Sequence, residues 1–596
     1  MDRERAELSP AGRRHALDRL STETFDILVI GGGVTGAGVA LDAATRGLSV
    51  GLVEQRDLAS GTSSRSSKLF HGGLRYLEQR NFRLVAEALA ERNLMLTELC
   101  PHLARPVSFV YPLRRRVVER AYVGTGIALY DRMARRHQSL LPGHRHLSRR
   151  AALRLVPALR SDALVGAIQY WDAQVDDARH TVELARTAAA HGATVASSLQ
   201  VTALHREGDR VVGVSARCAE TGREMVIRAT QVINATATWT DQIQSLAGRG
   251  QLRVRASKGI HLVVPRDRIH AGSGMILRTE SSVLFVIPWR SPSLVVAARG
   301  ALSDAAADHG HWIVGTTDTE WNLDLAHPAA SRSDIDYLLE QVNRVLRTPL
   351  THDDIEGVYA GLRPLLEGES EDNSALSREH AVTQHVPGLI SVAGGKYTTY
   401  RVMARDAVDM AVRNLDRRVP PSCTERVPLL GAVGYEPRWN NRHRIAEEAK
   451  LHVARVEHLL GRYGAQTDHL LDLIADQPAL GEPIARGGPY LAAEVVFAVT
   501  HEGALHLDDV LTRRTRLSIE TFHRGVDCAD EVARLMAGPL GWDERTVLDE
   551  INHYRLRVAA ERDSQTCADD RTADAVRMGA PETRRLVPMA ASADAD

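Results

Sequence analysis

Cysteine, net charge and long apolar runs are all scarce in this chain of 596 residues, and each scarcity excludes a class of protein. The five cysteines are isolated and lack C-x-x-C spacing, which argues against a zinc site or a disulfide framework and fits a reducing cytoplasm. No apolar run reaches about 18 residues and the charged N-terminus lacks the core of a signal peptide, so neither a membrane span nor secretion is expected. A formal net charge of -1 predicts no bulk attraction to nucleic acid.

Length and periodicity predict several domains. A chain of 596 residues is too long for one ordinary core. Strand-like runs separated by polar turns fill roughly 155–330, which predicts an antiparallel sheet that covers a substrate. After a proline break at 419–422, helical stripes continue to about residue 560, and the polar, Ala-rich end predicts disorder.

A glycine-rich turn between two apolar strands carries the first functional signal. FDILVI (25–30) is a predicted strand that ends on GGGVTG, a helix is expected at 37–46, and LSVGLVE (48–54) is the next strand. The motif Gly31-x-Gly33-x-x-Gly36 would admit a pyrophosphate to the helix N-terminus, and Glu54 would bind a ribose. A tight turn without a ligand is the alternative, and the motif does not separate NAD from FAD.

The stretch TSSRSSKLFHGGLRYL (62–77) concentrates hydroxyl, basic and glycine residues just past Glu54. Hydroxyls and glycine N–H groups suit a ligand with many acceptors, such as a diphosphate or an isoalloxazine ring. A solvated Ser-rich loop is the alternative, but it does not explain why Leu69, Phe70 and Leu74 alternate with basic residues. We therefore expect this loop to run along an extended cofactor.

A second strand-to-helix turn with glycines lies at AGGKYTTY (393–400). The helix N-terminus would stabilise the negative charge of a reduced flavin by about 0.3–1 kcal/mol, and Lys396 would add a full positive charge. A routine strand-helix junction is the alternative reading of this segment.

Two arginines and one histidine are further candidates. Arg363, in GLRPLL, and Arg378, in LSREHA, lie beside apolar residues, where bidentate anion binding is often built. His261 is a polar ring in the apolar strand SKGIHLVVP. Surface ion pairs for the arginines and a hydrogen-bonded core position for the histidine are the structural alternatives.

The segment 111–154 is strongly basic. Eleven arginines there face only Glu119 and Asp131, a local excess of nine positive charges. Such a patch would bind anionic lipid by about 1 kcal/mol for each basic residue near the surface. A solvated basic face is the alternative.

Taken together, the longer motifs resemble the FAD-dependent, aerobic-type glycerol-3-phosphate dehydrogenases over roughly residues 22–555. The resemblance rests on DILVIGGGVTGAGVALDAATRGLSVGLVE, SGTSSRSSKLFHGGLRYLE, WDAQVDDARH, SKGIHLVVPR, FVIPW, VGTTDT, GLRPL and GGKYTTYR. It implies an α/β fold in which a Rossmann-like FAD-binding domain is interleaved with an antiparallel-sheet substrate domain, followed by an all-helical C-terminal domain. The expected divisions are a polar tail at 1–22, the interleaved domains at 23–420 with the substrate part at roughly 105–165 and 240–380, the helical domain at 421–560, and a disordered tail at 561–596.

The resemblance also implies an activity. Such an enzyme oxidises sn-glycerol 3-phosphate to dihydroxyacetone phosphate by hydride transfer to FAD and passes the electrons to a membrane quinone of the respiratory chain. It would be a cytoplasmic protein, peripheral on the inner face of the cytoplasmic membrane and attached to an anionic membrane surface. A homodimer is one assembly compatible with the resemblance. No metal site and no nucleic-acid partner are expected.

Site residues are carried over from the family motifs by position. Substrate contacts are expected from Arg75, Tyr76, Arg363, Arg378 and Lys396. Catalytic roles are expected for His261, as the base that removes the C2 hydroxyl proton, and for Arg363 and Lys396. FAD contacts are expected from Gly31, Gly32, Gly33, Thr35, Gly36, Glu54, Thr62, Ser63, Ser66, Lys68, His71, Gly72, Gly395, Lys396, Tyr397 and Thr398.

The chain departs from the family pattern at two places. NATATW (234–239) has Ala237 where relatives usually have glycine, and a positive φ there would strain alanine by about 1–2 kcal/mol. An insertion at 290–311 separates FVIPW from WIVGTTD, and a surface loop, a lid or a partner site are all compatible with it.

Four other functions compete with the leading one. A glycerol-3-phosphate oxidase would pass electrons to oxygen, and an amine or amino-acid oxidase would not need several arginines around a phosphate. A non-catalytic flavoprotein would bind FAD without being reduced by substrate. An NAD-only dehydrogenase would be colourless.

Overall fold

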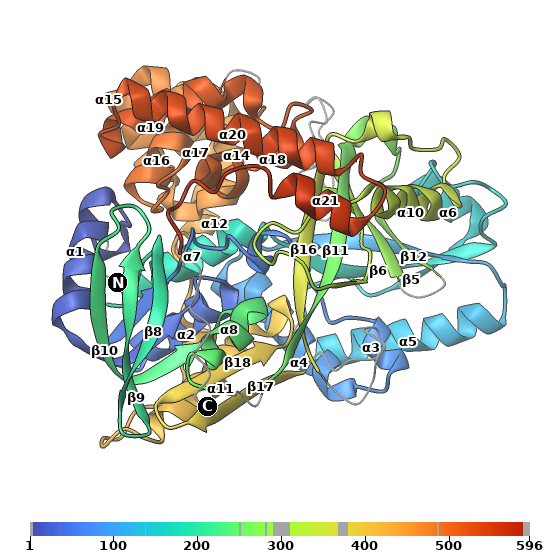
Figure 1. Cartoon of the computed structure of the whole chain (residues 1–596). Helices are drawn as coiled ribbons and strands as arrows, with labels where there is room; N and C mark the ends of the chain where they lie inside the picture. The colour runs from blue at the N-terminus through green and yellow to red at the C-terminus, as the bar shows by residue number, and fades with distance from the viewer. Residues whose placement is uncertain are drawn as a thin grey trace.

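Two β-sheets, each assembled from strands far apart in the chain, form the body of the molecule (Figure 1). The computed structural model describes residues 4–136, 139–248, 252–279, 283–289, 310–367, 379–484 and 488–587, without the side chain of Arg75. The first sheet has the order β17-β18-β10-β1-β2-β7, with β9 on β10 and β8 on β9. Its strands are β1 (Thr24–Ile30), β2 (Val50–Val53), β7 (Thr194–Ala196), β8 (Leu199–Glu207), β9 (Arg210–Cys218), β10 (Glu224–Asn234), β17 (His380–Val386) and β18 (Leu389–Gly394).

The centre of this sheet is parallel and buried. β1 pairs in parallel with β2 and β10, and β10 pairs in parallel with β18. Apolar, β-branched residues fill β1 because helices cover the sheet. The covering helices include α2 (Val34–Thr45), α7 (Asp177–Ala190) and α11 (Tyr400–Val412). A Cβ at Gly38 would lie 2.9 Å from the ring of Tyr400, so α2 and α11 approach closely. The expected β-α-β unit is confirmed.

The second sheet is mainly antiparallel. Its order is β15-β11-β14-β13-β12-β4-β6-β3, with β16 on β11 and β5 on β6. The pairs are antiparallel except that β12 runs parallel to β4. The strands are β3 (Leu69–Phe70), β4 (Arg105–Leu113), β5 (Arg145–Ser148), β6 (Gly166–Gln174), β11 (Val254–Pro265), β12 (Gly274–Arg278), β13 (Val283–Trp289), β14 (His311–Gly315), β15 (Thr319–Trp321) and β16 (Gly357–Leu366). A mainly antiparallel covering sheet is therefore present, but the range predicted for it, roughly 155–330, is wrong in part: β7–β10 of that range belong to the first sheet, and β4, β5 and β16 lie outside it.

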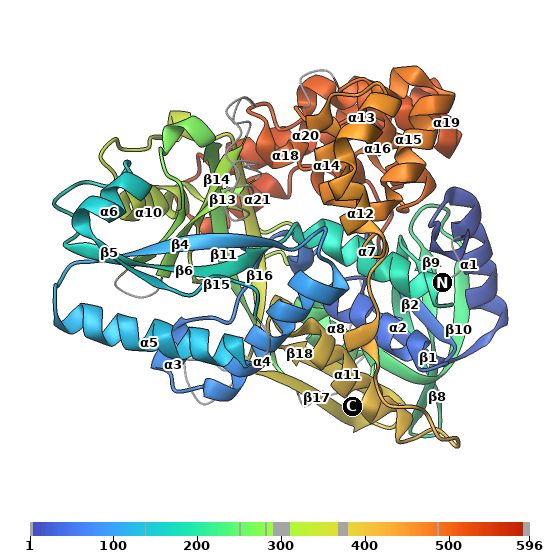
Figure 2. The same ribbon diagram turned by 180° about the vertical axis from the view of Figure 1, so that it is seen from behind.

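Helices on the rim of these sheets complete the first two thirds of the chain. They are α3 (Arg75–Glu78), α4 (Phe82–Leu94), α5 (Val118–Arg135), α6 (Arg149–Leu155), α8 (Thr240–Ser245) and α10 (Arg332–Asn343). Figure 2 shows α5 as a long helix along the outer edge of the second sheet, with only its inner side turned to the protein. Gly124, Ile127 and Tyr130 are its buried contacts.

The C-terminal third is helical, as predicted, and lies across one end of both sheets (Figures 1 and 2). Its longer helices are α14 (Val453–Tyr463), α15 (Thr467–Asp476), α16 (Ala492–Thr500), α19 (Ala529–Leu540) and α20 (Glu544–Ser564), with shorter α12 (Tyr435–Asn440), α13 (Arg442–Glu448), α17 (Leu507–Asp509) and α18 (Leu517–Glu520). A π-helical turn at Val510–Arg514 carries Arg513 and Arg514, two of the three arginines of the DDVLTRRTR segment.

Both ends of the chain are more ordered than the sequence suggested. The segment 1–22, expected to be a polar tail, contains α1 (Pro10–Thr22), whose Leu17 and Leu20 are buried against the first sheet. Disorder from residue 561 is wrong for the described residues up to 587, because α20 continues to Ser564 and α21 (Asp570–Arg577) follows. Tertiary ion pairs explain the difference: Arg584 is buried and its Nη2 lies 2.8 Å from an Asp509 carboxylate oxygen.

Within the described parts of the chain, every helix is too short or too polar to cross a lipid bilayer.

Candidate functional site

A cavity of ≈ 230 Å³ lies where the two sheets meet, between the β1–α2 turn, the 62–71 loop, β11, β16 and the turn after β18. Twelve of the predicted site residues line it: Thr35, Thr62, Ser63, Ser66, His71, Tyr76, His261, Arg363, Gly395, Lys396, Tyr397 and Thr398. These residues come from five separate stretches of sequence. Folding therefore brings the predicted cofactor and substrate residues to one place.

The β1–α2 turn has the geometry of a dinucleotide site. Gly31 has φ +111°, and a Cβ at Gly36 would collide with the carbonyl oxygen of Gly31. The Glu54 carboxylate, at the end of β2, accepts hydrogen bonds from the backbone N–H groups of Gly32 (2.7 Å) and Arg56 (2.8 Å). Burial raises the pKa of Glu54, which these hydrogen bonds oppose. The glycine cradle and the acid beside it fit the adenosine diphosphate half of FAD.

Hydrogen bonds join the 62–68 loop to α2 on one side and to β16 on the other. Ser63 Oγ accepts from the N–H of Val34 at 2.9 Å and so caps the N-terminus of α2. Thr62 donates to the carbonyl oxygen of Leu362 at 2.7 Å, which ties the loop to β16. The hydroxyls that line the cavity are therefore positioned by both sheets.

Seven residues that we assigned to the cofactor are placed outside the cavity lining: Gly31, Gly32, Gly33, Gly36, Glu54, Lys68 and Gly72. The first five belong to the β1–α2 turn and the end of β2 described above. Lys68 is fully buried, and its Nζ lies 2.8 Å from Asp177 of α7. Burial and the charge of Arg516 lower the pKa of Lys68 to about 8, although Asp177 opposes them. The backbone N–H of Gly72 donates to the Tyr130 hydroxyl at 2.8 Å. Lys68 thus anchors the loop from behind.

The turn after β18 presents a cation and backbone to the cavity. Gly394 and Gly395 both have φ near +77° (+78° and +76°), which leads the chain into a helical turn and then α11. Lys396 Nζ lies 3.6 Å from the centre of the Tyr76 ring and donates to the Gly72 carbonyl oxygen at 3.5 Å. The Tyr397 hydroxyl points inward and donates to the Asp177 carbonyl oxygen at 2.7 Å. Tyr397 therefore offers its ring, not its hydroxyl, to the cavity.

His261 lies in the middle of β11 and is 2 % exposed. Its Nε2 shares a hydrogen bond with Ser67 Oγ at 2.9 Å, and its ring stacks on Tyr359 with centroids 4.8 Å apart. Nδ1 is buried without a hydrogen-bond partner among the described residues. Burial first, and then the charges of Arg363 and Lys68, hold the pKa of His261 well below its usual 6.5. The imidazole is neutral, so it has the capacity to accept a proton.

Arg363, on β16, is fixed from the side of β14. Its Nη1 lies 3.2 Å from Asp318, and its Nη2 donates to Thr316 Oγ1 and to the Thr317 carbonyl oxygen, each at 3.0 Å. This arrangement holds the planar guanidinium at the cavity wall, and Lys396 lines the same cavity. Two cations in one cavity are suited to a phosphate or carboxylate group.

Four further predictions have separate outcomes. Ala237 lines the cavity with φ +53°, so the positive φ anticipated at this family glycine position is confirmed. Arg75 begins α3, but its side chain lies outside the described residues. Arg378 and residues 290–309 of the insertion also lie outside them.

Sequence reasoning missed the residues that support the two key side chains. Ser67 and Tyr359 hold His261, while Thr316 and Asp318 hold Arg363. The polar run GTTDT directly after an apolar strand was the available signal for the second pair. Tyr359 carried no such signal, because its pairing with His261 depends on the register of β16 against β11.

A parallel sheet with a dinucleotide turn, joined to a second sheet across a mainly apolar cavity that holds a few polar side chains, defines a flavin- or nicotinamide-dependent oxidoreductase. The model of the FAD dependent oxidoreductase family matches residues 26–408, and that of the C-terminal domain of alpha-glycerophosphate oxidase matches residues 422–547. The chain belongs to the family of FAD-dependent glycerol-3-phosphate dehydrogenases.

Individual relatives agree over nearly the whole chain. Glycerol-3-phosphate dehydrogenase 2 of Mycobacterium tuberculosis is 56% identical over 97% of this chain and 96% of its own length. The mitochondrial glycerol-3-phosphate dehydrogenase of Homo sapiens is 34% identical over 92% of this chain and 75% of its own. The structure of the Bacillus halodurans glycerol-3-phosphate dehydrogenase complexed with FAD matches with a TM-score of 0.73 and 29% identity over 92% of this chain and 98% of its own. FAD is accordingly the cofactor of this fold.

Proposed function

We propose that this chain oxidises sn-glycerol 3-phosphate to dihydroxyacetone phosphate in the ≈ 230 Å³ cavity, with bound FAD supplying the hydride acceptor. The convergence of a neutral histidine, His261, with two fixed cations, Arg363 and Lys396, carries this proposal. A secondary alcohol needs a base for its hydroxyl proton, and a phosphomonoester needs cations that hold its charge.

The roles of the individual residues follow from their chemistry. His261 would take the C2 hydroxyl proton through Nδ1 or Nε2, while Ser67 and the stacked Tyr359 keep the ring in place. Arg363 and Lys396 would bind the substrate phosphate, and the Tyr76 ring, 3.6 Å from Lys396 Nζ, would lie beside them. Arg75 and Arg378 stay candidate phosphate ligands from the family motifs.

The cofactor-binding residues would act in three groups. The turn at Gly31–Gly36 and Glu54 would hold the adenosine diphosphate, and the Thr62–Ser66 loop would follow the diphosphate. His71 and the 395–398 turn would flank the isoalloxazine ring, where Lys396 would stabilise negative charge on the reduced form. Lys68 and Gly72 would support this loop without touching the cofactor.

An anaerobic absorbance spectrum before and after addition of sn-glycerol 3-phosphate tests the reaction. Loss of the flavin band would establish cofactor, substrate and hydride transfer in one experiment. A flavin band that persists, in protein shown to be folded and loaded with FAD, would rule out this substrate or this activity.

The electron acceptor is the second part of the proposal. We assign it to a membrane quinone, as the resemblance to respiratory dehydrogenases implies. Residues 422–547 match the model of the C-terminal domain of alpha-glycerophosphate oxidase, so oxygen is the competing acceptor. Steady-state rates with a soluble quinone, compared with hydrogen peroxide formed in its absence, separate the two: stoichiometric peroxide without quinone would make the enzyme an oxidase.

We further propose that α5 and the residues around it attach the protein to an anionic membrane surface. Arg114, Arg115 and Arg116 are exposed, and so are the apolar side chains Val117 (76 %) and Val118 (71 %) beside them. Charge draws such a surface to anionic lipid, and the apolar side chains enter the interface. The two acidic residues of segment 111–154 already have partners. Glu119 accepts hydrogen bonds from backbone N–H groups, and Asp131 pairs with His144.

Cosedimentation with vesicles tests this attachment. Changing Arg114, Arg115 and Arg116 together to Glu should abolish binding to vesicles that contain anionic lipid, with activity on a soluble quinone unchanged. Arg444→Glu, at an exposed position on the C-terminal domain, is the matched control. Equal binding by all three proteins would remove α5 from the proposal.

A further inference from the structure

A second polar cavity, of ≈ 70 Å³, lies between the C-terminal helices and the rest of the molecule. A cavity of this kind needs only about 10–15 Å³ to hold one water, so it has room for a small polyatomic ion. Its walls come from the 64–65 loop, the 327–330 segment, β16, the turn at 512–519, α20 and α21. Five arginines line it, and Glu561 is the one carboxylate among its lining residues.

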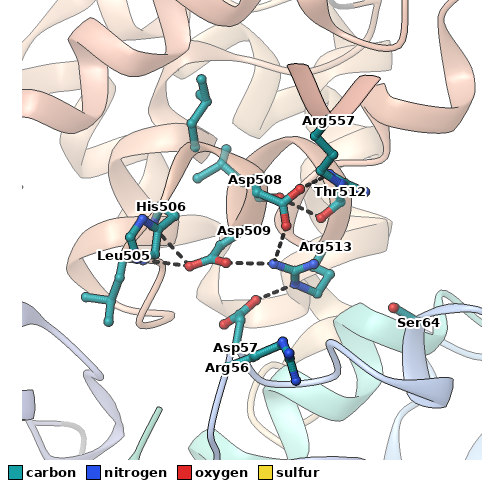
Figure 3. Close-up of polar contacts among 12 residues, drawn as sticks. Arg56, Asp57, Ser64, Leu505, His506, Asp508, Asp509, Thr512, Arg513 and Arg557 are labelled. Atoms are coloured by element: carbon teal, nitrogen blue, oxygen red, sulfur yellow. Dashed lines mark hydrogen bonds and ion pairs between the residues drawn. The ribbon is translucent and has the colours of Figure 1, made fainter. Parts of the chain in front are cut away.

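Ion pairs on the far side of the cavity wall hold two of these arginines in place. Arg513 Nε lies 2.5 Å from Asp57, which reaches it from the first sheet, and Figure 3 shows this pair with Asp508 and Asp509 around the same guanidinium. Arg516 Nη2 lies 2.6 Å from Asp176 at the start of α7. Because these carboxylates sit outside the cavity, the cavity itself keeps an excess of positive charge.

Glu561 is shared by the next two arginines. Its Oε1 lies 2.9 Å from Arg557 Nη2 and 3.5 Å from Arg577 Nη2. Burial opposes the ionisation of Glu561, but the charges of Arg557 and Arg577 outweigh it and lower its pKa to about 2. Arg557 Nη1 also pairs with Asp508, as Figure 3 shows, and Arg577 Nη2 contacts His327 Nδ1 at 3.4 Å. Asp508 does not line the cavity, so Glu561 is the carboxylate that these two guanidinium groups share within it.

Arg65 is the fifth arginine. Its Nη1 donates to the Ala326 carbonyl oxygen at 3.0 Å, and it makes no ion pair with any carboxylate in the described ranges. Burial, and then the charges of Arg557 and Arg513, lower the pKa of Arg65 to about 9. A cation held in this way among other cations costs stability that a bound anion would recover.

We propose that this arginine cavity is a second anion site, separate from the flavin cavity, and that it takes a phosphate group, either as free phosphate or on a small phosphomonoester. Planar guanidinium groups match the oxygens of phosphate in bidentate geometry, and the cavity lining adds the hydroxyls of Ser518 and Ser564. Its small volume excludes a nucleotide.

Arg65 connects this site with the flavin cavity. It lines both cavities, and it lies in the same loop as Thr62 and Ser63, which line the flavin cavity. An anion bound to Arg65 would restrain this loop and hold the C-terminal helices against the first sheet. Occupancy is therefore expected to stabilise the folded protein in proportion to the anion bound.

Equilibrium dialysis of the FAD-loaded enzyme against radiolabelled inorganic phosphate tests the proposal. Arg577→Gln, which does not touch the flavin cavity, should weaken phosphate binding at this site at least tenfold. Glu561→Gln removes the competing carboxylate and should strengthen it, so a folding defect in the first variant does not decide the outcome. Arg444→Gln is the control for loss of a surface arginine.

A third variant distinguishes phosphate bound in the arginine cavity from phosphate bound in the flavin cavity. If Arg363→Gln abolishes all phosphate binding while Arg577→Gln and Glu561→Gln match the wild type, phosphate binds only at the substrate site and the proposal is overturned. Competition with methyl phosphate identifies the source: tighter binding of the ester assigns the site to a phosphorylated metabolite, and tighter binding of inorganic phosphate assigns it to the free ion.

Discussion

At the scale of single residues, His261 shows how its surroundings decide its protonation. The ring has Tyr359 on one face, Ser67 at Nε2 and no partner at Nδ1 within the described structure. Burial and two nearby cations depress its pKa, so the neutral form prevails over the pH range in which an exposed histidine would titrate. A neutral imidazole at the cavity wall has a nitrogen able to accept a proton, and its position in the cavity, not its lowered pKa, supports this role.

We predict that His261→Gln slows flavin reduction by sn-glycerol 3-phosphate by about 10²-fold or more, while the substrate KM changes little. Glutamine keeps a polar side chain but cannot accept the proton. Stopped-flow absorbance in the absence of oxygen measures the rate. Tyr359→Phe, which keeps the stacked ring and loses only the hydroxyl bonded to the Ser66 carbonyl oxygen, is the control. A single-turnover rate equal to that of the wild type would contradict the role of His261.

Ala237 has a backbone conformation that is unfavourable for any residue with a Cβ. Its φ of +53° lies in the left-handed region, where a Cβ costs about 1 kcal/mol relative to glycine. We predict that Ala237→Gly raises the free energy of unfolding by up to about 1 kcal/mol, measured by urea denaturation of the FAD-loaded protein. Ala235→Gly, two residues earlier and outside the left-handed region, should lower it. The reverse order would show that the turn is not strained.

At the scale of elements, the segment from 505 to 587 is joined to the body by buried ionic groups. His506 Nδ1 lies 2.8 Å from Glu550 of α20, and its Nε2 lies 3.1 Å from Glu220. Burial and the charge of Arg584 oppose its protonation, but the hydrogen bonds to both glutamates outweigh them and raise the pKa of His506 to about 10. The imidazolium therefore connects two parts of the chain.

This raised pKa makes stability fall on the alkaline side. The contribution of His506 is complete below the unfolded pKa of about 6.5 and is lost as the pH rises towards 10, because the unfolded chain releases the proton first. We predict that His506→Gln flattens the decline of unfolding free energy between pH 7 and pH 10 measured by urea titration. His523→Gln, an exposed position, should leave the slope unchanged. Identical slopes for wild type and His506→Gln would contradict the assignment.

At the scale of the whole molecule, the flavin cavity joins the two sheets. One wall belongs to the β1–α2 and β18–α11 turns of the first sheet, and the other to β11 and β16 of the second. Hydrogen bonds with Val34 and Leu362 join the 62–68 loop to both walls of the cavity. A cofactor held there contacts both layers, so its binding energy contributes to the stability of the assembled fold.

We predict that removal of FAD lowers the melting temperature and that added FAD restores it. With free FAD 100-fold above its Kd, binding adds about 2.7 kcal/mol to the free energy of unfolding. Differential scanning fluorimetry of the apoprotein with increasing FAD measures the shift. AMP, which offers only the adenosine half of the ligand, should restore far less than FAD does. A melting temperature independent of FAD would mean that the cofactor does not bind across the sheets.

Local patterns in the sequence determined the parts of this protein that depend on neighbouring residues. The β1–α2–β2 unit with Gly31, Gly36 and Glu54 is readable because a dinucleotide turn uses residues close in the chain, each required by backbone geometry. The covering sheet and the helical C-terminal domain follow from periodicity, and the strain at Ala237 follows from a family motif.

Tertiary structure alone decided what depends on contacts between distant segments. The polar ends of the chain looked unable to fold because their stability comes from partners such as Asp509 for Arg584, more than 70 residues away. Lys68 looked like a cofactor ligand until α7 supplied Asp177 as its partner, and the arginine cavity exists only because six separate segments meet there. Charge pairing and burial act through space, so their outcome is not contained in any local pattern.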